Sequence, residues 1–249
     1  MIILKSPEEI DSMRLAGAVV AKAHALVREL IRPGITTWDL DQAVEDFLLQ
    51  QKAIPAFKGY HGYPASICTS LNEQVVHGIP SKKTVLREGS ILSVDIGAFV
   101  DGFCGDSAWT YPVGEIDEEY QVLLETAKEA LFQGIAEARV GNRLSDISHA
   151  VQSRAEKQGF SVVRDFVGHG IGREMHEPPQ IPNFGPPGRG PRLKQGMTLA
   201  IEPMVNVGSY EVEVLGDNWT VVTRDRGWSA HFEHTIAITD GNPEILTAL

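Results

Sequence analysis

The chain has 249 residues, of which 43% are hydrophobic, so it can bury a large core without disulfides. Its 33 acidic and 22 basic side chains give a formal charge of −11, which disfavours extensive contact with nucleic acid or an anionic membrane. Cys68 and Cys104 make no disulfide framework, and no basic region precedes a long apolar segment near the start. We therefore expect a soluble protein of the cytoplasm.

The first half of the chain begins with two predicted helices. Ser6-Pro7-Glu8-Glu9 supplies an N-cap, a first-turn proline and the glutamate of a capping box, and Arg32-Pro33-Gly34 ends the apolar stripe that follows. A second amphipathic pattern starts near Thr36-Thr37 and stops before Ile54-Pro55. After a glycine- and aromatic-rich loop, short β-strands are expected at residues 65–69 and 74–77.

Residues 91–111 predict a β-hairpin with an acidic residue in each strand, because Asp101-Gly102 is typical of a tight turn. A four-residue loop would place Asp95 opposite Asp106 with Cβ atoms about 5 Å apart, whereas a two-residue turn would make them diagonal neighbours roughly 7 Å apart. Either register is destabilising unless a cation lies between the carboxylates or one of them takes up a proton. The alternative is that one acid is an exposed turn residue.

The second half of the chain repeats the first at an offset of 107 residues. A third helix capped by Asp117 and a fourth over residues 145–158 follow the hairpin. Arg32-Pro33-Gly34 corresponds to Arg139-Val140-Gly141, Gly89 to Gly196, and Asp95 to Glu202. We therefore predict one α+β domain, residues 1–249, built from two helix–helix–antiparallel-strand halves, about 1–113 and 114–249. The Pro/Gly-rich residues 177–192 are expected to form a functional loop.

Strand alternation in the second half directs two more acids towards the hairpin. Glu202 ends a predicted strand over residues 197–202, and Glu233 lies opposite the apolar face that contains His234 in residues 230–239. His169, between small residues, could supply a nitrogen ligand. Four carboxylates and one imidazole suit two bridged divalent cations about 3.5–4 Å apart, and such donors favour Mn, Fe, Co or Zn. Each glutamate could instead be a solvated strand residue, and His169 a loop residue bonded to the backbone.

Four segments, in this order and spacing, resemble the type I methionine aminopeptidases of bacteria: VDIGAFVDGFCGDSAW, VGHGIGREMHEPPQIPNFG, GMTLAIEPM and SAHFEHTIAIT. The resemblance covers essentially the whole chain and implies the pita-bread fold, with two pseudo-twofold-related halves around a dinuclear metal centre. By position in these segments, Asp95 would bind one metal, Asp106 and Glu233 would bridge both, and His169 and Glu202 would hold the second.

The resemblance also implies removal of the N-terminal methionine, preferentially before a small second residue. Glu202 would relay a proton from the attacking water, His77 would lie near the scissile nitrogen, and His176 would stabilise the oxyanion. Without the motif, His77 reads as a strand-end residue and His176 as a loop tip. A thioether pocket, which ordinary core packing would equally explain, is expected from five residues: Tyr60, Tyr63, Cys68, Met175 and Trp219.

One position departs from the family pattern. His231 stands where glutamine is more usual, and strand parity directs it to the site, so substrate affinity or pH dependence is expected to differ while metal binding should not. Two rival interpretations are a prolidase or Xaa-Pro aminopeptidase, which usually carries a further N-terminal domain, and a non-enzymatic interaction protein of the same fold. We expect a monomer, because the sequence shows no type II insertion and no N-terminal extension rich in cysteine or lysine. The resemblance implies action on nascent polypeptides and peptides with N-terminal methionine, and it admits transient association with the ribosome.

Overall fold

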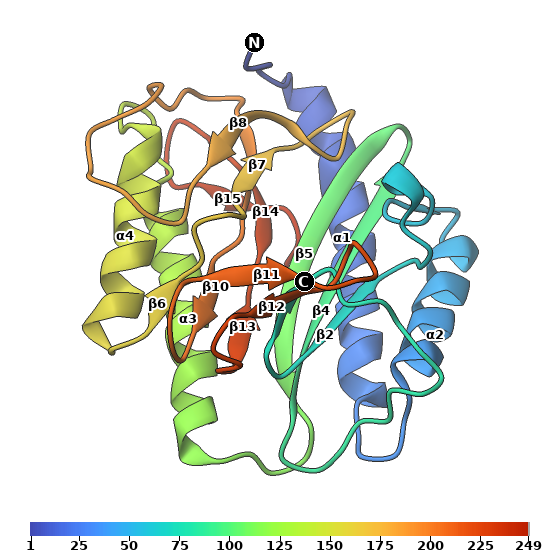
Figure 1. Cartoon of the computed structure of the whole chain (residues 1–249). Helices are drawn as coiled ribbons and strands as arrows, with labels where there is room; N and C mark the ends of the chain where they lie inside the picture. The colour runs from blue at the N-terminus through green and yellow to red at the C-terminus, as the bar shows by residue number, and fades with distance from the viewer. Residues whose placement is uncertain (249) are drawn as a thin grey trace.

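The computed structural model describes residues 1–248 and has the predicted α+β architecture (Figure 1). In this view α1 lies behind the β4–β5 hairpin with α2 to its right, and the two helices of the second half lie at the left. The helices are α1 (Pro7–Leu30), α2 (Thr37–Gln50), α3 (Glu118–Glu137) and α4 (Leu144–Lys157), with a short 3₁₀ helix at Tyr60–Gly62. The strands of the first half are β1 (Ile54–Pro55), β2 (Cys68–Leu71), β3 (Gln74–Val76), β4 (Ile91–Val100) and β5 (Phe103–Pro112).

The strands of the second half are shorter and more numerous. They are β6 (Ser161–Val162), β7 (Gly168–Gly170), β8 (Glu177–Ile181), β9 (Thr198–Ile201), β10 (Met204–Asn206), β11 (Val212–Val214), β12 (Val221–Thr223), β13 (Ser229–His231), β14 (His234–Ala237) and β15 (Glu244–Ile245). The expectation that residues 177–192 form a loop is therefore wrong for the first five residues, which make an antiparallel strand beside β7. The predicted strand over 65–69 likewise begins three residues late, at Cys68.

The first two helices start as their local sequence predicts. Ser6 accepts a hydrogen bond from the Glu9 N–H while the Glu9 side chain accepts one from the Ser6 N–H, and Thr36 and Asp39 repeat this capping box at α2. Asp117 occupies the N-cap position of α3, but its side chain makes no capping hydrogen bond. The capping box predicts these two helix starts correctly because it joins residues only three positions apart in the sequence.

The central hairpin adopts the two-residue turn. Asp95 pairs with Ala108 and Gly97 with Asp106, so the four-residue-loop register is wrong. Asp101 and Gly102 have φ angles of 49° and 80°, the combination that a type I′ turn requires. The two acids are consequently diagonal neighbours on one face of the β4–β5 ladder.

The 107-residue repeat is visible in the backbone. Helices α2 and α4 have 14 residues each and occupy corresponding positions. Gly89 and Gly196, each just before a strand that carries or precedes a site acid, have φ angles of 84° and 88°. The isolated bridges Thr36↔Val85 and Arg143↔Arg192 are also related by this offset.

The second half contains two strand breaks. The predicted strand over residues 197–202 is β9, one residue shorter at each end, and the predicted strand over residues 230–239 is broken into two. β9 ends at Ile201 and β10 begins at Met204, while β13 ends at His231 and β14 begins at His234. The two breaks face each other, since β9 pairs with β14 and β10 with β13. Pro203 has no N–H to donate to a ladder, so the break occurs where the backbone can no longer pair continuously.

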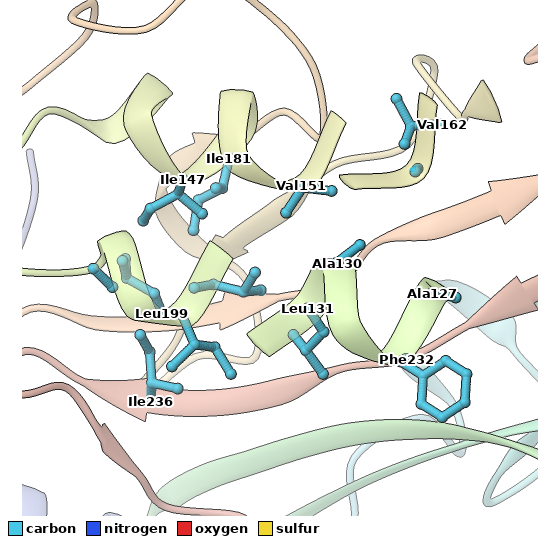
Figure 2. Close-up of a cluster of buried hydrophobic side chains, with 14 of the residues drawn as sticks. Ala127, Ala130, Leu131, Ile147, Val151, Val162, Ile181, Leu199, Phe232 and Ile236 are labelled. Atoms are coloured by element: carbon cyan, nitrogen blue, oxygen red, sulfur yellow. The ribbon is translucent and has the colours of Figure 1, made fainter. Parts of the chain in front are cut away.

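The second-half helices cover one face of the β14–β9–β7 sheet (Figure 2). Side chains of α3 and α4, among them Leu131 and Val151, meet Leu199 of β9 and Ile236 of β14 in a buried apolar cluster. Because side chains alternate along a strand, the opposite face of this sheet is left for the polar residues. Among residues 1–248, no helix combines the length and apolar character needed to cross a membrane.

Candidate metal centre

Asp95 and Asp106 lie at the middle of the β4–β5 hairpin. Gly97, the cross-strand partner of Asp106, leaves them the space they need. A Cβ at residue 97 would lie 3.2 Å from Asp106 Oδ1 and 2.8 Å from Phe57 Cε1. Asp106 itself is 4% exposed. The hairpin therefore holds two closely spaced acids, of which Asp106 is buried and Asp95 is half-buried.

His169 is a strand residue, not a loop residue. It pairs with Gln180 of β8 and Ala200 of β9 and is 7% exposed. Its Nδ1–H donates to the Gly170 carbonyl at 2.9 Å, which leaves the Nε2 lone pair free for a metal ion. The flanking glycines allow the backbone of the neighbouring strands to approach closely, since a Cβ at Gly168 would lie 2.4 Å from the Ala200 carbonyl oxygen.

Glu202 and Glu233 lie in the two strand breaks. At its break, Glu233 turns to the first half of the molecule: its N–H donates to the Ala108 carbonyl at 2.8 Å, and Ser107 Oγ donates to the Glu233 carbonyl at 2.7 Å. Glu202 Oε1 lies 3.5 Å from His169 Nε2. The interruptions therefore bring the glutamates to the hairpin.

The five predicted ligands all line one cavity. One donor atom each from Asp106, His169 and Glu233 lies within 4.8 Å of the others. Three carboxylate oxygens, Asp95 Oδ1, Asp106 Oδ1 and Glu233 Oε1, are buried without a hydrogen-bond partner among residues 1–248. Buried polar atoms are nearly always paired in proteins, so these oxygens indicate a site suited to a cationic ligand. An oxygen-rich set with one imidazole nitrogen fits a divalent metal ion.

The electrostatics agree with a cation site. Burial, followed by the charges of Asp106 and Glu202, raises the pKa of Asp95 well above its usual range. Burial followed by the charge of Asp106 does the same to the pKa of Glu202 and of Glu233. Burial also raises the pKa of Asp106 to about 7. Such a cluster resists being fully ionised unless a positive charge is bound among the carboxylates.

A cavity of about 120 Å³ opens beside the carboxylates. Tyr63 and Trp219 form one wall, with ring centroids 5.0 Å apart, and the Tyr63 hydroxyl donates to the Gly78 carbonyl at 2.9 Å. Phe57 also lines it, and the sequence prediction does not include it, although it lies two residues before the glycine- and aromatic-rich loop. The five pocket residues predicted from the resemblance all line this cavity: Tyr60, Tyr63, Cys68, Met175 and Trp219.

His77 and His176 flank the cavity. His77 follows β3 with a φ of 60°, an uncommon conformation for a residue with a side chain, and burial lowers its pKa to about 4. His176 is exposed, but its Nδ1 is hydrogen-bonded to the Tyr60 hydroxyl at 2.8 Å and its ring centroid lies 4.3 Å from that of His169. Both imidazoles are therefore positioned beside the metal centre.

The remaining two histidines of this region differ in position. His231 is 2% exposed, and its Nε2 lies 3.6 Å from Glu202 Oε2 without a hydrogen-bond partner in the described part of the chain, so it faces the site as predicted. Burial, followed by the charge of His77, lowers the pKa of His231 to about 3. His234 instead hydrogen-bonds Thr247 Oγ1 through Nδ1 at 2.8 Å and packs against Trp109, in agreement with its apolar-face prediction.

The fold and this acid-rich centre are those of a metallopeptidase, and the chain belongs to Metallopeptidase family M24, which matches residues 11–240. A methionine aminopeptidase of Clostridium acetobutylicum is 56% identical over 247 residues, with 99% of each chain covered. The crystal structure of a methionine aminopeptidase from Thermotoga maritima is similar with a TM-score of 0.99 and 51% identity, covering 100% of both chains. The expected pita-bread fold is thereby confirmed.

A second group of similar structures shares only the fold. A prolidase from Pyrococcus furiosus has a TM-score of 0.81 at 23% identity, and the match covers 99% of this chain but 66% of that chain. At this identity the likeness shows a common scaffold and says nothing of substrate. The substrate must therefore be argued from the residues around the metal centre.

Proposed function

We propose that this protein is a methionine aminopeptidase, which removes the N-terminal methionine from nascent polypeptides and peptides, preferentially before a small second residue. One observation carries the proposal: the unpaired buried carboxylates lie beside a 120 Å³ cavity that is lined by thiol, thioether and aromatic side chains. Sulfur and aromatic surfaces suit an unbranched thioether side chain. The full-length similarity to methionine aminopeptidases supports the same substrate.

The proposed cofactor is a pair of divalent ions such as Mn, Fe, Co or Zn. In this proposal the ions would be held by five side chains: Asp95, Asp106, His169, Glu202 and Glu233. Two such ions, when bound, lower the pKa of water enough to supply hydroxide near neutral pH and polarise the peptide carbonyl. The donor set supports this assignment because it holds more carboxylate charge than one divalent cation would balance.

The chain's own residues would then bind the peptide and move protons. Glu202, beside His169 and His231, accepts the proton of the attacking water and passes it to the leaving amine. His77 hydrogen-bonds the scissile amide nitrogen, and His176 donates to the developing oxyanion. The small cavity accommodates one side chain, which restricts cleavage to the first residue.

The proposal extends to the organisation of the enzyme. We infer one catalytic domain, residues 1–249, whose halves 1–113 and 114–249 both contribute ligands. It acts as a monomer in the cytoplasm with transient association with the ribosome. The backbone hydrogen bond between Glu233 of the second half and Ala108 of the first supports a site that needs both halves.

Comparing two peptides tests the substrate class. Enzyme supplied with Mn or Co should release methionine from Met-Gly-Met and leave an Xaa-Pro peptide largely uncut, as monitored by chromatography of the free amino acid. Preference for the Xaa-Pro peptide would establish the prolidase alternative instead. Inactivity on both peptides across Mn, Fe, Co and Zn would favour a non-enzymatic interaction protein.

A further inference from the structure

Lys5 is a buried charged residue that precedes α1. Its Nζ lies 2.6 Å from Glu177 Oε2, and the two side chains are only 2% and 7% exposed. The Lys5 N–H donates to the Gly196 carbonyl at 2.7 Å, so the backbone of this segment is also fixed. A lysine is rarely buried to this extent, and its ammonium requires a paired, hydrogen-bonded carboxylate.

Glu177 connects this ammonium to the turn that carries His176. Its second oxygen, Oε1, accepts hydrogen bonds from the N–H groups of Arg173 and Glu174 at 2.9 and 3.3 Å. The packing is tight, because a Cβ at Gly172 would lie 2.2 Å from Lys5 Cε and 2.6 Å from Glu177 Oε1. Both carboxylate oxygens are thus used, one by the N-terminal segment and one by the turn.

Other contacts fix Met175 better than they fix His176. Met175 is 4% exposed and belongs to a buried apolar cluster with Met13 and Ile171. His176 is exposed, and its side-chain hydrogen bond joins it to the Tyr60 hydroxyl. Arg173 of the same turn also forms an ion pair with Glu9, with 3.1 Å between Arg173 Nη2 and Glu9 Oε1. This pair is solvent-exposed, and such pairs contribute little to stability. The Lys5–Glu177 pair, immediately beside His176, is therefore the strongest polar anchor of this turn.

We propose that Lys5 is a positioning residue for the reaction: through Glu177 it fixes the turn so that the His176 imidazole stays against His169 at the metal centre. This inference rests on the oxyanion role proposed above for His176. Lys5 does not line the substrate cavity, and Met175 is held by packing. Loss of Lys5 should accordingly reduce turnover more than substrate binding.

A double-mutant cycle with His176 tests this role on the full-length protein loaded with Mn. Lys5→Met should lower kcat for Met-Gly-Met about tenfold, since even a small misplacement of a reacting group is costly. KM should stay within about threefold, and Lys5→Met should cause no further loss of kcat in a His176→Ala background. Arg173→Met is the matched control, because it removes the exposed ion pair of the same turn, and it should keep kcat within about twofold.

The charge-neutral double variant Lys5→Met/Glu177→Gln provides a second test should the buried, unpaired Glu177 prevent Lys5→Met from folding. Its glutamine oxygen can still accept from Arg173 and Glu174, so it should fold and show the same loss of kcat. Wild-type kcat in a folded Lys5 variant, with His176→Ala impaired, would overturn the inference and leave the proposed function intact. An equal loss of kcat with and without His176 would show that Lys5 merely supports the fold. Wild-type kcat in His176→Ala would overturn the proposed role of His176 and this inference with it.

Discussion

Gly97→Ala should weaken metal binding, although Gly97 is not itself a proposed metal ligand. The added methyl carbon would lie 2.8 Å from Phe57 Cε1, 3.0 Å from Ala56 Cβ and 3.2 Å from Asp106 Oδ1. Relief requires movement of the Phe57 ring, which lines the cavity, or of the Asp106 carboxylate. Overpacking of this kind costs about 1–3 kcal/mol of folding free energy. Displacing the groups that orient a ligand typically costs about 10–100-fold in metal affinity.

Isothermal titration of chelator-treated protein with Mn measures this affinity, and release of methionine from Met-Gly-Met measures activity. Gly216→Ala is the matched control, because a Cβ there meets no atom within 4 Å. Gly97→Ala should bind Mn roughly 10–100-fold more weakly than Gly216→Ala and show a correspondingly lower activity at limiting metal. Equal affinities and activities for the two variants would refute the reasoning that Gly97 makes space for the Asp106 carboxylate.

Two further predictions concern stability. Filling one metal site with Mn or Co at about 100 times its Kd should stabilise the folded state by about 2.7 kcal/mol, or roughly 5–11 °C in Tm for a domain of this size, by scanning fluorimetry. Asp106→Asn should abolish most of that shift, and a shift of the same size in this variant would count against the proposed ligands. Burial lowers the pKa of His24 to about 4. Because the unfolded chain then binds more protons below about pH 6.5, stability is lost as the pH falls. Between pH 7.5 and 5.0, urea titrations should show wild type losing about 2 kcal/mol more than His24→Gln, and equal losses would contradict this.

Local signals made much of the first half predictable. The capping boxes at Ser6 and Thr36 join residues three apart, so the helix starts follow directly from the sequence. The sequence leaves the register of the hairpin open, because the register depends on Asp101 adopting a positive φ, which the sequence permits but does not require. Predicting the fold class and the 107-residue repeat does not depend on the conformation of single residues.

The strands of the second half are less predictable from sequence, because hydrogen bonds to distant parts of the chain interrupt the expected alternation. Glu233 leaves the expected strand to donate its N–H to Ala108, and this partner lies in the other half of the chain. Pro203 was the visible signal of the paired break. The buried Lys5–Glu177 pair joins residues 172 positions apart, and neither residue carries a local mark of burial. Alternation nevertheless directs Glu202 and Glu233 towards the hairpin, and both line the cavity beside it.

A metal titration of methionine release tests the central claim most directly. Chelator-treated protein is mixed with Met-Gly-Met, and free methionine is measured as Mn is added to wild type and to Asp106→Asn. The proposed function predicts no release without metal, saturable release in wild type, and release reduced by orders of magnitude in Asp106→Asn. Full release from exhaustively chelated protein, or equal release by Asp106→Asn, would contradict it.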